Sequence, residues 1–300
     1  MSTVTVGISL VGPRAAGYAR RGYQRPAVGL AHRVRALRPD RPFLYAMDLL
    51  DPATLPDGWH RPATVLDAML APAAPHLRIS PAVSAARVTT SLAYAALGRP
   101  AVGLALMRRV PDVSAGSLLL RLDDDGLVEQ AAVGSPVVAM RAHDPLSGHA
   151  DAVVVPDDAA LVGWLADRAL EVLTPLIDDL HRRTRFGVVP MWNLAADTAL
   201  GPSTVAPLLA GGSQAAGREI GEALVDALVS RGAPIRRRGV AQEVETASRG
   251  TALAPVRGSC CLHYRDCSGH PSSGSVCASC PLLDGRLRAE RFEDGLPLPR

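Results

Sequence analysis

The chain contains no lysine, because all 32 of its basic residues are arginine. Reactions that need a side-chain amine are therefore excluded, including Schiff-base chemistry, a P-loop lysine and a lysine general base. Aromatic residues make up only 4% of the 300 residues, which argues against a surface that stacks single-stranded bases. The net charge of +3 is too small to indicate a nucleic-acid partner. We therefore expect no nucleic acid to bind.

Long hydrophobic runs are also missing. The N-terminal segment has no basic region followed by an apolar run, so it does not have the pattern of a secretory signal. The most apolar stretch, residues 92–107, is interrupted by Gly98-Arg99-Pro100 and is shorter than the roughly 20 residues that span a membrane. The pattern predicts a cytoplasmic protein with no integral membrane segment. No Gly-x-Gly-x-x-Gly motif follows a predicted strand, so a nicotinamide or flavin site is not indicated.

With 48% hydrophobic and 20% charged residues, the chain has the composition of a folded protein. Proline is frequent from Pro13 to Pro75, and we expect only short helices in this part of the chain, at 27–37 and 63–70. Ser84 is placed to cap a helix that ends at Leu97. Val102, Leu104 and Leu106 alternate with other residues, which predicts a strand over 101–109.

A β-hairpin is the clearest local signal. Residues 117–123 and 127–133 flank Asp124-Asp125-Gly126, and Asp-Gly is a favoured turn dipeptide. Residues 137–141 and 152–155 are expected to add strands to the same antiparallel sheet.

After residue 156 the apolar residues recur at helical spacing. We predict a helix from Asp157 or Asp158 to about Arg183, kinked or split at Pro175, and a second helix over 215–229. The expected class is α+β, with an antiparallel sheet in the N-terminal half and a largely helical C-terminal half ending in a metal-binding loop. The predicted regions are an N-terminal α+β part, a helical part and a cysteine segment: 1–155, 156–256 and 257–300.

All five cysteines lie close to the C-terminal end of the sequence, and none precedes Cys260. They form the adjacent pair Cys260-Cys261 and the close pair Cys277-Ala-Ser-Cys280, with Cys267 between the pairs. In a cytosolic protein such a cluster binds metal more often than it forms disulfides. Four thiolates suit either tetrahedral zinc or an iron–sulfur cluster.

Zinc and a Rieske centre are the first two alternatives. A zinc ribbon takes two C-x-x-C pairs, and only Cys277 and Cys280 have that spacing, although the length of the loop between Cys261 and Cys277 suits zinc. Cys261-Leu-His263 has the C-x-H form of half a Rieske site. The second half ends in Cys280 instead of a histidine, which disfavours that centre. A Rieske site would also leave Cys260 without a role.

The third alternative is a [2Fe–2S] cluster, which takes two thiolates per iron and so matches two separated pairs. The segment Arg257-Gly-Ser-Cys-Cys-Leu-His-Tyr-Arg, followed by Cys277-x-x-Cys280-Pro-Leu, resembles the C-terminal segment of the FhuF-type ferric-siderophore reductases. That family carries the motif C-C-x(10)-C-x(2)-C. Here the interval between the two pairs, 262–276, is longer than in the motif, and it contains Cys267. An insertion in a flexible loop adds little closure entropy, so the site can tolerate it.

The resemblance implies a [2Fe–2S] cluster bound by Cys260, Cys261, Cys277 and Cys280. It also implies an enzyme that reduces the Fe(III) of a ferric siderophore to Fe(II), one electron at a time. Because no nicotinamide or flavin motif is present, a separate donor such as a ferredoxin or a reductase would supply the electrons. Two alternatives without this activity are an iron–sulfur sensor of redox state or iron and a zinc-stabilised binding protein.

Overall fold

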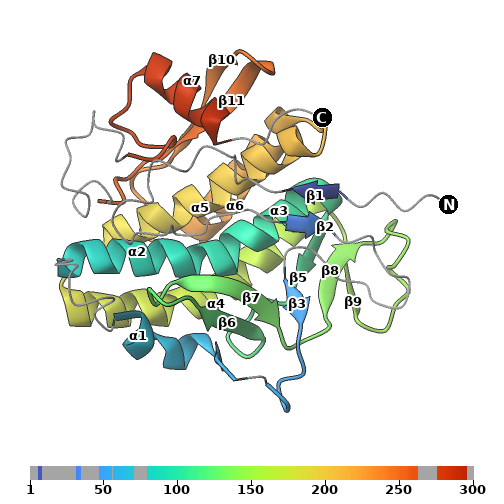
Figure 1. Ribbon diagram of the computed structural model, residues 1–300. Helices are drawn as coiled ribbons and strands as arrows, with labels where there is room; N and C mark the ends of the chain where they lie inside the picture. Colours follow the sequence, from blue (N-terminus) through green and yellow to red (C-terminus); the bar gives the residue numbers. More distant parts are fainter. Residues whose placement is uncertain are drawn as a thin grey trace.

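The structure, a computed structural model, describes residues 6–8, 32–34, 47–55, 57–70, 80–262 and 276–295. Long helices occupy the middle of the molecule, with small sheets along one side and a C-terminal hairpin with a short helix on the other (Figure 1). The predicted α+β class is confirmed. None of the described helices is both long and apolar enough to cross a lipid bilayer.

The first long helical segment consists of α2 (Pro81–Ala93), a π-helix (Tyr94–Gly98) and α3 (Arg99–Met107), which follow one another directly. Ser80, and not Ser84 as predicted, caps α2 by accepting a hydrogen bond from the N–H of Val83. The strand predicted over 101–109 is wrong, because residues up to 107 are helical. Most of α3 is buried, so it has no polar face, and alternation alone could not separate a strand from a helix.

Helix α4 (Asp158–Thr184) confirms the helix predicted from Asp157. Asp157 is its N-cap, and one carboxylate oxygen accepts a hydrogen bond of 2.8 Å from the N–H of Ala160. Pro175 lies inside the helix, which continues through it as one element and is not split.

Helices α5 (Val188–Leu209) and α6 (Gln214–Ser230) pack closely against each other, and α6 confirms the helix predicted over 215–229. Side chains on every side of α5 are buried. Gly217 and Gly221 permit the close approach, because a Cβ at either position would overlap Ser203 of α5. This contact fixes α5, which carries two polar side chains of the candidate site.

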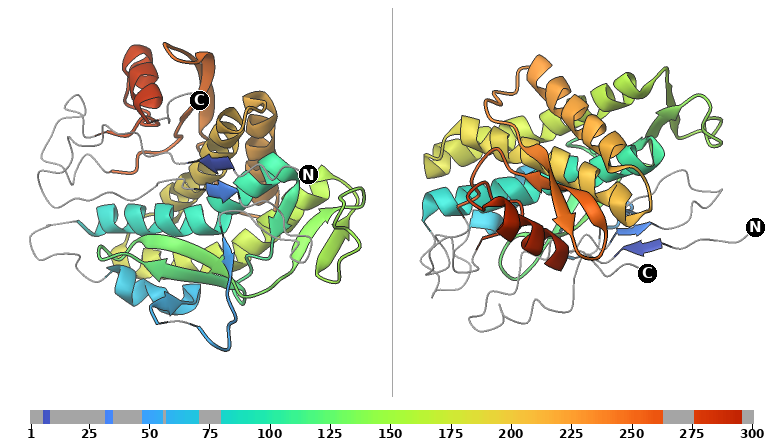
Figure 2. Two further views of the ribbon diagram at one scale, coloured as in Figure 1. Left: turned by 45° about the vertical axis from the view of Figure 1, so that its right-hand side comes forward. Right: turned by 90° about the horizontal axis from the view of Figure 1, so that it is seen from above.

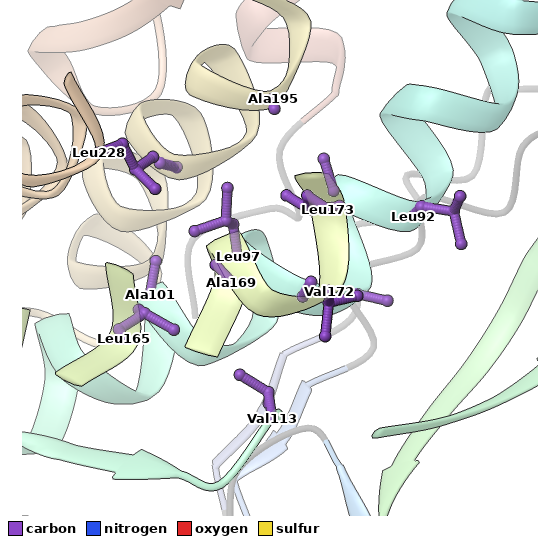
Figure 3. Close-up of a cluster of buried hydrophobic side chains, with 14 of the residues drawn as sticks. Leu92, Leu97, Ala101, Val113, Leu165, Ala169, Val172, Leu173, Ala195 and Leu228 are labelled. Atoms are coloured by element: carbon purple, nitrogen blue, oxygen red, sulfur yellow. The ribbon is translucent and has the colours of Figure 1, made fainter. Parts of the chain in front are cut away.

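One hydrophobic core lies between these helices and draws on both sides of residue 156 (Figure 3). Leu97 and Leu165, for example, come from the two predicted regions and are both fully buried in it. Figure 3 also labels side chains contributed by α2, α4 and α6: Leu92, Val172, Leu173 and Leu228.

The predicted hairpin is confirmed as β6 (Leu118–Leu122) and β7 (Val128–Val133), which pair antiparallel. Gly126 in its turn has φ of 72°, a conformation that glycine adopts without strain. The sheet is completed by two short strands, β4 (Trp59–His60) antiparallel to β6 and β3 (Asp48–Leu49) parallel to β7.

Strands β8 (Val138–Arg141) and β9 (Ala152–Val155) form as predicted but in a different sheet. They join β5 (Arg109–Pro111) in the order β5-β8-β9, and β8 is parallel to β9. The expectation of one antiparallel sheet is therefore wrong. Gly134-Ser135-Pro136 separates β7 from β8, and the chain leaves the first sheet there and enters the second.

The N-terminal elements are short. Helix α1 (Pro62–Leu70) confirms the helix predicted over 63–70. Strands β1 (Val6–Ile8) and β2 (His32–Val34) pair antiparallel, so the helix predicted over 27–37 is wrong at 32–34, and its other residues lie outside the described ones. Pairing with a strand distant in sequence outweighed the local pattern.

Candidate metal centre

Both cysteine pairs are attached to a small C-terminal frame. The frame consists of the antiparallel hairpin β10 (Val240–Thr246) and β11 (Gly250–Val256) and the helix α7 (Gly285–Asp294), which lie side by side (Figure 2). Val244, Ala252, Ala254 and Phe292 of the frame form an apolar cluster with Val205 of α5. The region predicted as helical, 156–256, therefore ends in a hairpin. Strand β11 was not predicted, because it contains alanine and proline, which are uncommon in strands.

The frame is held at two points. At the hairpin turn, the Glu293 carboxylate of α7 accepts hydrogen bonds from the N–H groups of Ala247 and Ser248, at 2.9 and 2.6 Å. On β11, the Gln214 side chain of α6 both donates to the carbonyl and accepts from the N–H of Leu253, each at 2.9 Å. The strand that leads into the first cysteine pair and the helix that follows the second are thus fixed relative to each other.

Arg257 and Ser279 join the two cysteine segments. The Arg257 N–H donates to the carbonyl of Ser279 at 2.9 Å, and its Nε donates to the Ser279 hydroxyl oxygen at 3.2 Å. Arg257 is three residues before Cys260, and Ser279 lies inside the Cys277–Cys280 pair. The cysteines at the two ends of the loop are therefore brought to the same place.

Two side chains of α5 hold the backbone next to the first pair. The two oxygens of the Asp197 carboxylate accept from the N–H groups of Gly258 and Ser259, at 2.8 and 3.2 Å. One turn earlier on the same helix face, the Asn193 oxygen accepts from the N–H groups of Arg236 and Arg237, at 2.9 and 3.1 Å. A Cβ at Gly258 would overlap the backbone of Arg237 and Arg238, so no side chain fits there.

Asp197 is buried, with only 8% of its surface exposed. Burial raises the pKa of its carboxyl to about 6, although the N–H of Gly258 and the charge of Arg257 favour the ionised form. Near neutral pH the carboxylate therefore remains an acceptor for both backbone groups.

Several donors lie next to the cysteine sulfurs. The N–H of Leu262 donates to Sγ of Cys260 at 3.4 Å, and the Ser279 hydroxyl lies 3.5 Å from Sγ of Cys277. Burial raises the pKa of the Cys280 thiol, and the N–H of Leu282 acts in the opposite direction. The second pair is folded as a turn, in which the Cys280 N–H donates to the Cys277 carbonyl at 2.9 Å.

Two arginines bring positive charge to the cysteines. Burial acts against the charged form of Arg257, yet its pKa is raised by four acidic neighbours: Cys277, Cys261, Asp197 and Cys280. Arg288 of α7 is 3% exposed, and its guanidinium donates to the carbonyls of Cys280 and Leu283 at 2.9 and 2.8 Å. Burial lowers the pKa of Arg288, and the sulfurs of Cys280 and Cys277 counteract this effect.

Cys261, Cys277 and Cys280 lie near enough to Arg257 to raise its pKa, and Cys260 lies near enough to Cys280 to influence the pKa of that thiol. Cys267 lies outside the described residues. Within the described ranges, no three histidine, cysteine, aspartate or glutamate side chains are gathered closely enough to hold a metal ion. The predicted pairs are therefore brought to one site without forming a closed ligand set.

The residues that surround the cysteines were not predicted from the sequence. The sequence does contain a signal for Asn193 and Asp197, which lie four positions apart in the mostly apolar helix α5. No comparable signal existed for Ser279 or Arg288, because their partners are set by how the frame folds.

Comparison of the chain with protein-family models, with curated proteins and with solved structures gives no match.

Proposed function

We propose that this chain is a cytoplasmic ferric-siderophore reductase whose [2Fe–2S] cluster is bound by Cys260, Cys261, Cys277 and Cys280. The observation that carries the proposal is the Arg257–Ser279 junction, which brings together the two cysteine pairs of an FhuF-type C-C and C-x-x-C pattern. The pairs are attached to a folded frame at both ends of the loop that separates them.

The residues at the site fit such a cluster in type and pairing. A binuclear cluster takes two thiolates per iron, and the chain offers two cysteine pairs. Donors next to the ligand sulfurs are a common feature of iron–sulfur sites, and Leu262 and Ser279 provide one at each pair. The guanidinium groups of Arg257 and Arg288 compensate the negative charge that four thiolates and the cluster would carry.

When bound, the cluster would supply the single electron that converts chelated Fe(III) to Fe(II). Siderophore oxygens are hard ligands that hold Fe(II) much less tightly, so reduction releases the iron. The reaction requires no acid or base from the chain, whose part is to hold the ligands and attract its partners. A separate donor protein would return the electron.

A positively charged loop lies beside the site. Arg236, Arg237 and Arg238 are exposed, and the backbone of this loop contacts Gly258. Arg238 forms an ion pair with Asp226. This loop offers positive charge to an acidic electron donor or to an anionic ferric chelate.

The test is a single-turnover reaction under anaerobic conditions. Protein reduced with dithionite and freed of excess reductant is mixed with a ferric hydroxamate siderophore and ferrozine, which traps Fe(II). We expect the cluster to be reoxidised while the ferrozine colour develops in proportion. A Cys277→Ser variant that lacks the cluster serves as the control and should produce no colour.

Two other results would assign a different function. A reduced cluster that persists for hours beside several ferric siderophores, with no Fe(II) formed, would indicate an iron–sulfur sensor or carrier. A colourless protein with one bound zinc ion would indicate a zinc-stabilised binding protein.

A further inference from the structure

The Ser279 hydroxyl lies between a permanent positive charge and a cysteine sulfur. Its oxygen is 3.2 Å from Arg257 Nε and 3.5 Å from Cys277 Sγ. A guanidinium group can only donate, so the serine oxygen is the acceptor in the first contact. A thiolate sulfur has no proton and can only accept. With Cys277 as a ligand, the serine must therefore donate its own proton to that sulfur.

The three groups are held in this arrangement by other contacts. A backbone hydrogen bond of 2.9 Å from the Arg257 N–H to the Ser279 carbonyl fixes the two residues side by side. Asp197 holds the next two backbone N–H groups along the chain, those of Gly258 and Ser259. On the other side, Arg288 holds the carbonyl of Cys280. The hydroxyl is thus positioned from both segments.

We propose that Arg257 and Ser279 form a relay that polarises a hydrogen bond to Cys277 and so raises the reduction potential of the cluster. The inference rests on the proposed function, because it requires Cys277 to be a cluster ligand. Reduction adds negative charge to the cluster and its sulfurs, and hydrogen bonds to the sulfurs stabilise that charge. Both residues act through Cys277, so they are positioning residues and not catalytic ones.

The geometry allows an effect on the reduction potential to be distinguished from a role in holding the two cysteine segments together. The junction between the two segments also depends on backbone atoms, the Arg257 N–H and the Ser279 carbonyl. Ser279→Ala removes the hydroxyl and leaves that backbone hydrogen bond in place. The variant should therefore fold and bind the cluster while its potential changes.

The experiment measures the reduction potential of the full-length, cluster-loaded protein by anaerobic spectroelectrochemical titration. We expect Ser279→Ala to shift the potential to a more negative value by a tenfold change in the one-electron equilibrium, about 59 mV. Ser279→Thr keeps a hydroxyl and should restore most of the difference. Ser259→Ala is the matched control, because the Ser259 hydroxyl makes no hydrogen bond among the described residues, and its potential should equal that of the original protein.

A second variant tests the other end of the relay. Arg257→Gln retains the Ser279 hydroxyl but removes the positive charge, and should also make the potential more negative. If Ser279→Ala fails to bind the cluster, the reduction potential of Arg257→Gln tests the relay in its place. The relay is overturned if Ser279→Ala, or Arg257→Gln in its place, binds an intact cluster with an unchanged potential. A protein that binds no [2Fe–2S] cluster overturns the proposed function as well, so the two failures are distinguishable.

Discussion

Arg109 and Arg257 lie in two regions of the molecule and have different partners. Arg109 of β5 is 6% exposed, and its guanidinium makes two hydrogen bonds to the Asp144 carboxylate, at 2.6 and 2.7 Å. Arg257 instead donates to the hydroxyl of Ser279. Its acidic neighbours include three cysteine sulfurs together with the Asp197 carboxylate.

The comparison separates a structural ion pair from a site that attracts negative charge. Arg109 and Asp144 neutralise each other in a bidentate pair, which orders the chain between β5 and the loop after β8. At the cysteines, the guanidinium of Arg288 hydrogen-bonds to carbonyl oxygens, and Arg257 adds a second positive charge. Thiolates and a bound anionic cluster would balance these charges. The difference supports the proposal that the cysteine region, and not the Arg109 region, binds an anionic ligand.

The largest expected effect comes from the proposed ligands. Replacing Cys260, Cys261, Cys277 or Cys280 with serine should abolish or severely weaken the visible absorption of the anaerobically purified protein, because each removes one thiolate. Cys267→Ala should leave the absorption essentially unchanged. Loss of colour in Cys267→Ala together with its retention in Cys261→Ala would contradict the ligand assignment.

Removing the structural arginine should affect stability and not the cluster. Arg109→Ala leaves the largely buried Asp144 carboxylate without its charged partner, and breaking a buried ion pair typically lowers the free energy of unfolding by about 3–5 kcal/mol. Urea denaturation measures this loss. The folded fraction should keep the cluster absorption of the original protein. A change below about 1 kcal/mol, the range of an exposed ion pair, would show that Arg109 and Asp144 are not a buried pair.

Removing the acceptor next to the first cysteine pair should have a smaller, local effect. Asp197→Ala leaves the N–H groups of Gly258 and Ser259 without their partner, at a cost of about 1–3 kcal/mol for a buried group. Hydrogen exchange should become faster at 257–262, while α4 remains protected. Asn193→Ala is the matched variant on the same helix face and should act at Arg236 and Arg237 instead. Equal acceleration across the whole chain in both variants would contradict these separate roles.

The smallest effect is a pH dependence in the structural region. Burial tends to raise the pKa of Asp144, but hydrogen bonds from Arg109 and from the N–H of Leu146 outweigh it and lower the pKa. The folded state therefore binds this proton less readily than the unfolded state. The resulting stability is present above the unfolded pKa, about 3.9, and is lost as pH falls through the lower folded value.

Urea denaturation at a series of pH values, with Asp144→Asn beside the original protein, measures this contribution. The difference in stability between the two proteins should shrink as the pH falls below about 4. A difference that stays constant down to about pH 2 would contradict a lowered pKa for Asp144.

The sequence allowed prediction of elements that have one polar and one apolar face. Helices α4 and α6 show the helical period clearly, and the β6–β7 hairpin contains a favoured turn. Prediction failed where burial is nearly complete, as in α3, because no polar face reveals the period. It also missed β11, whose alanines and proline are poor strand formers.

The candidate site likewise contains residues that could be predicted from the sequence and residues that could not. Local spacing in the sequence identified the cysteines. The groups that support them come from contacts between distant segments: Asp197 and Gly258 are 61 residues apart, and Arg257 and Ser279 are 22 apart. Such partners depend on how α5 and the C-terminal frame pack, and no local pattern encodes that packing.

Whether the two cysteine pairs hold a [2Fe–2S] cluster is tested most directly by spectroscopy combined with metal analysis. Protein purified without oxygen is assayed for iron, acid-labile sulfide and zinc, and its visible absorption is recorded before and after dithionite is added. We expect a brown protein with about two iron and two sulfide ions per chain, whose absorption bleaches on reduction. A colourless protein that contains zinc and neither iron nor sulfide would contradict this expectation.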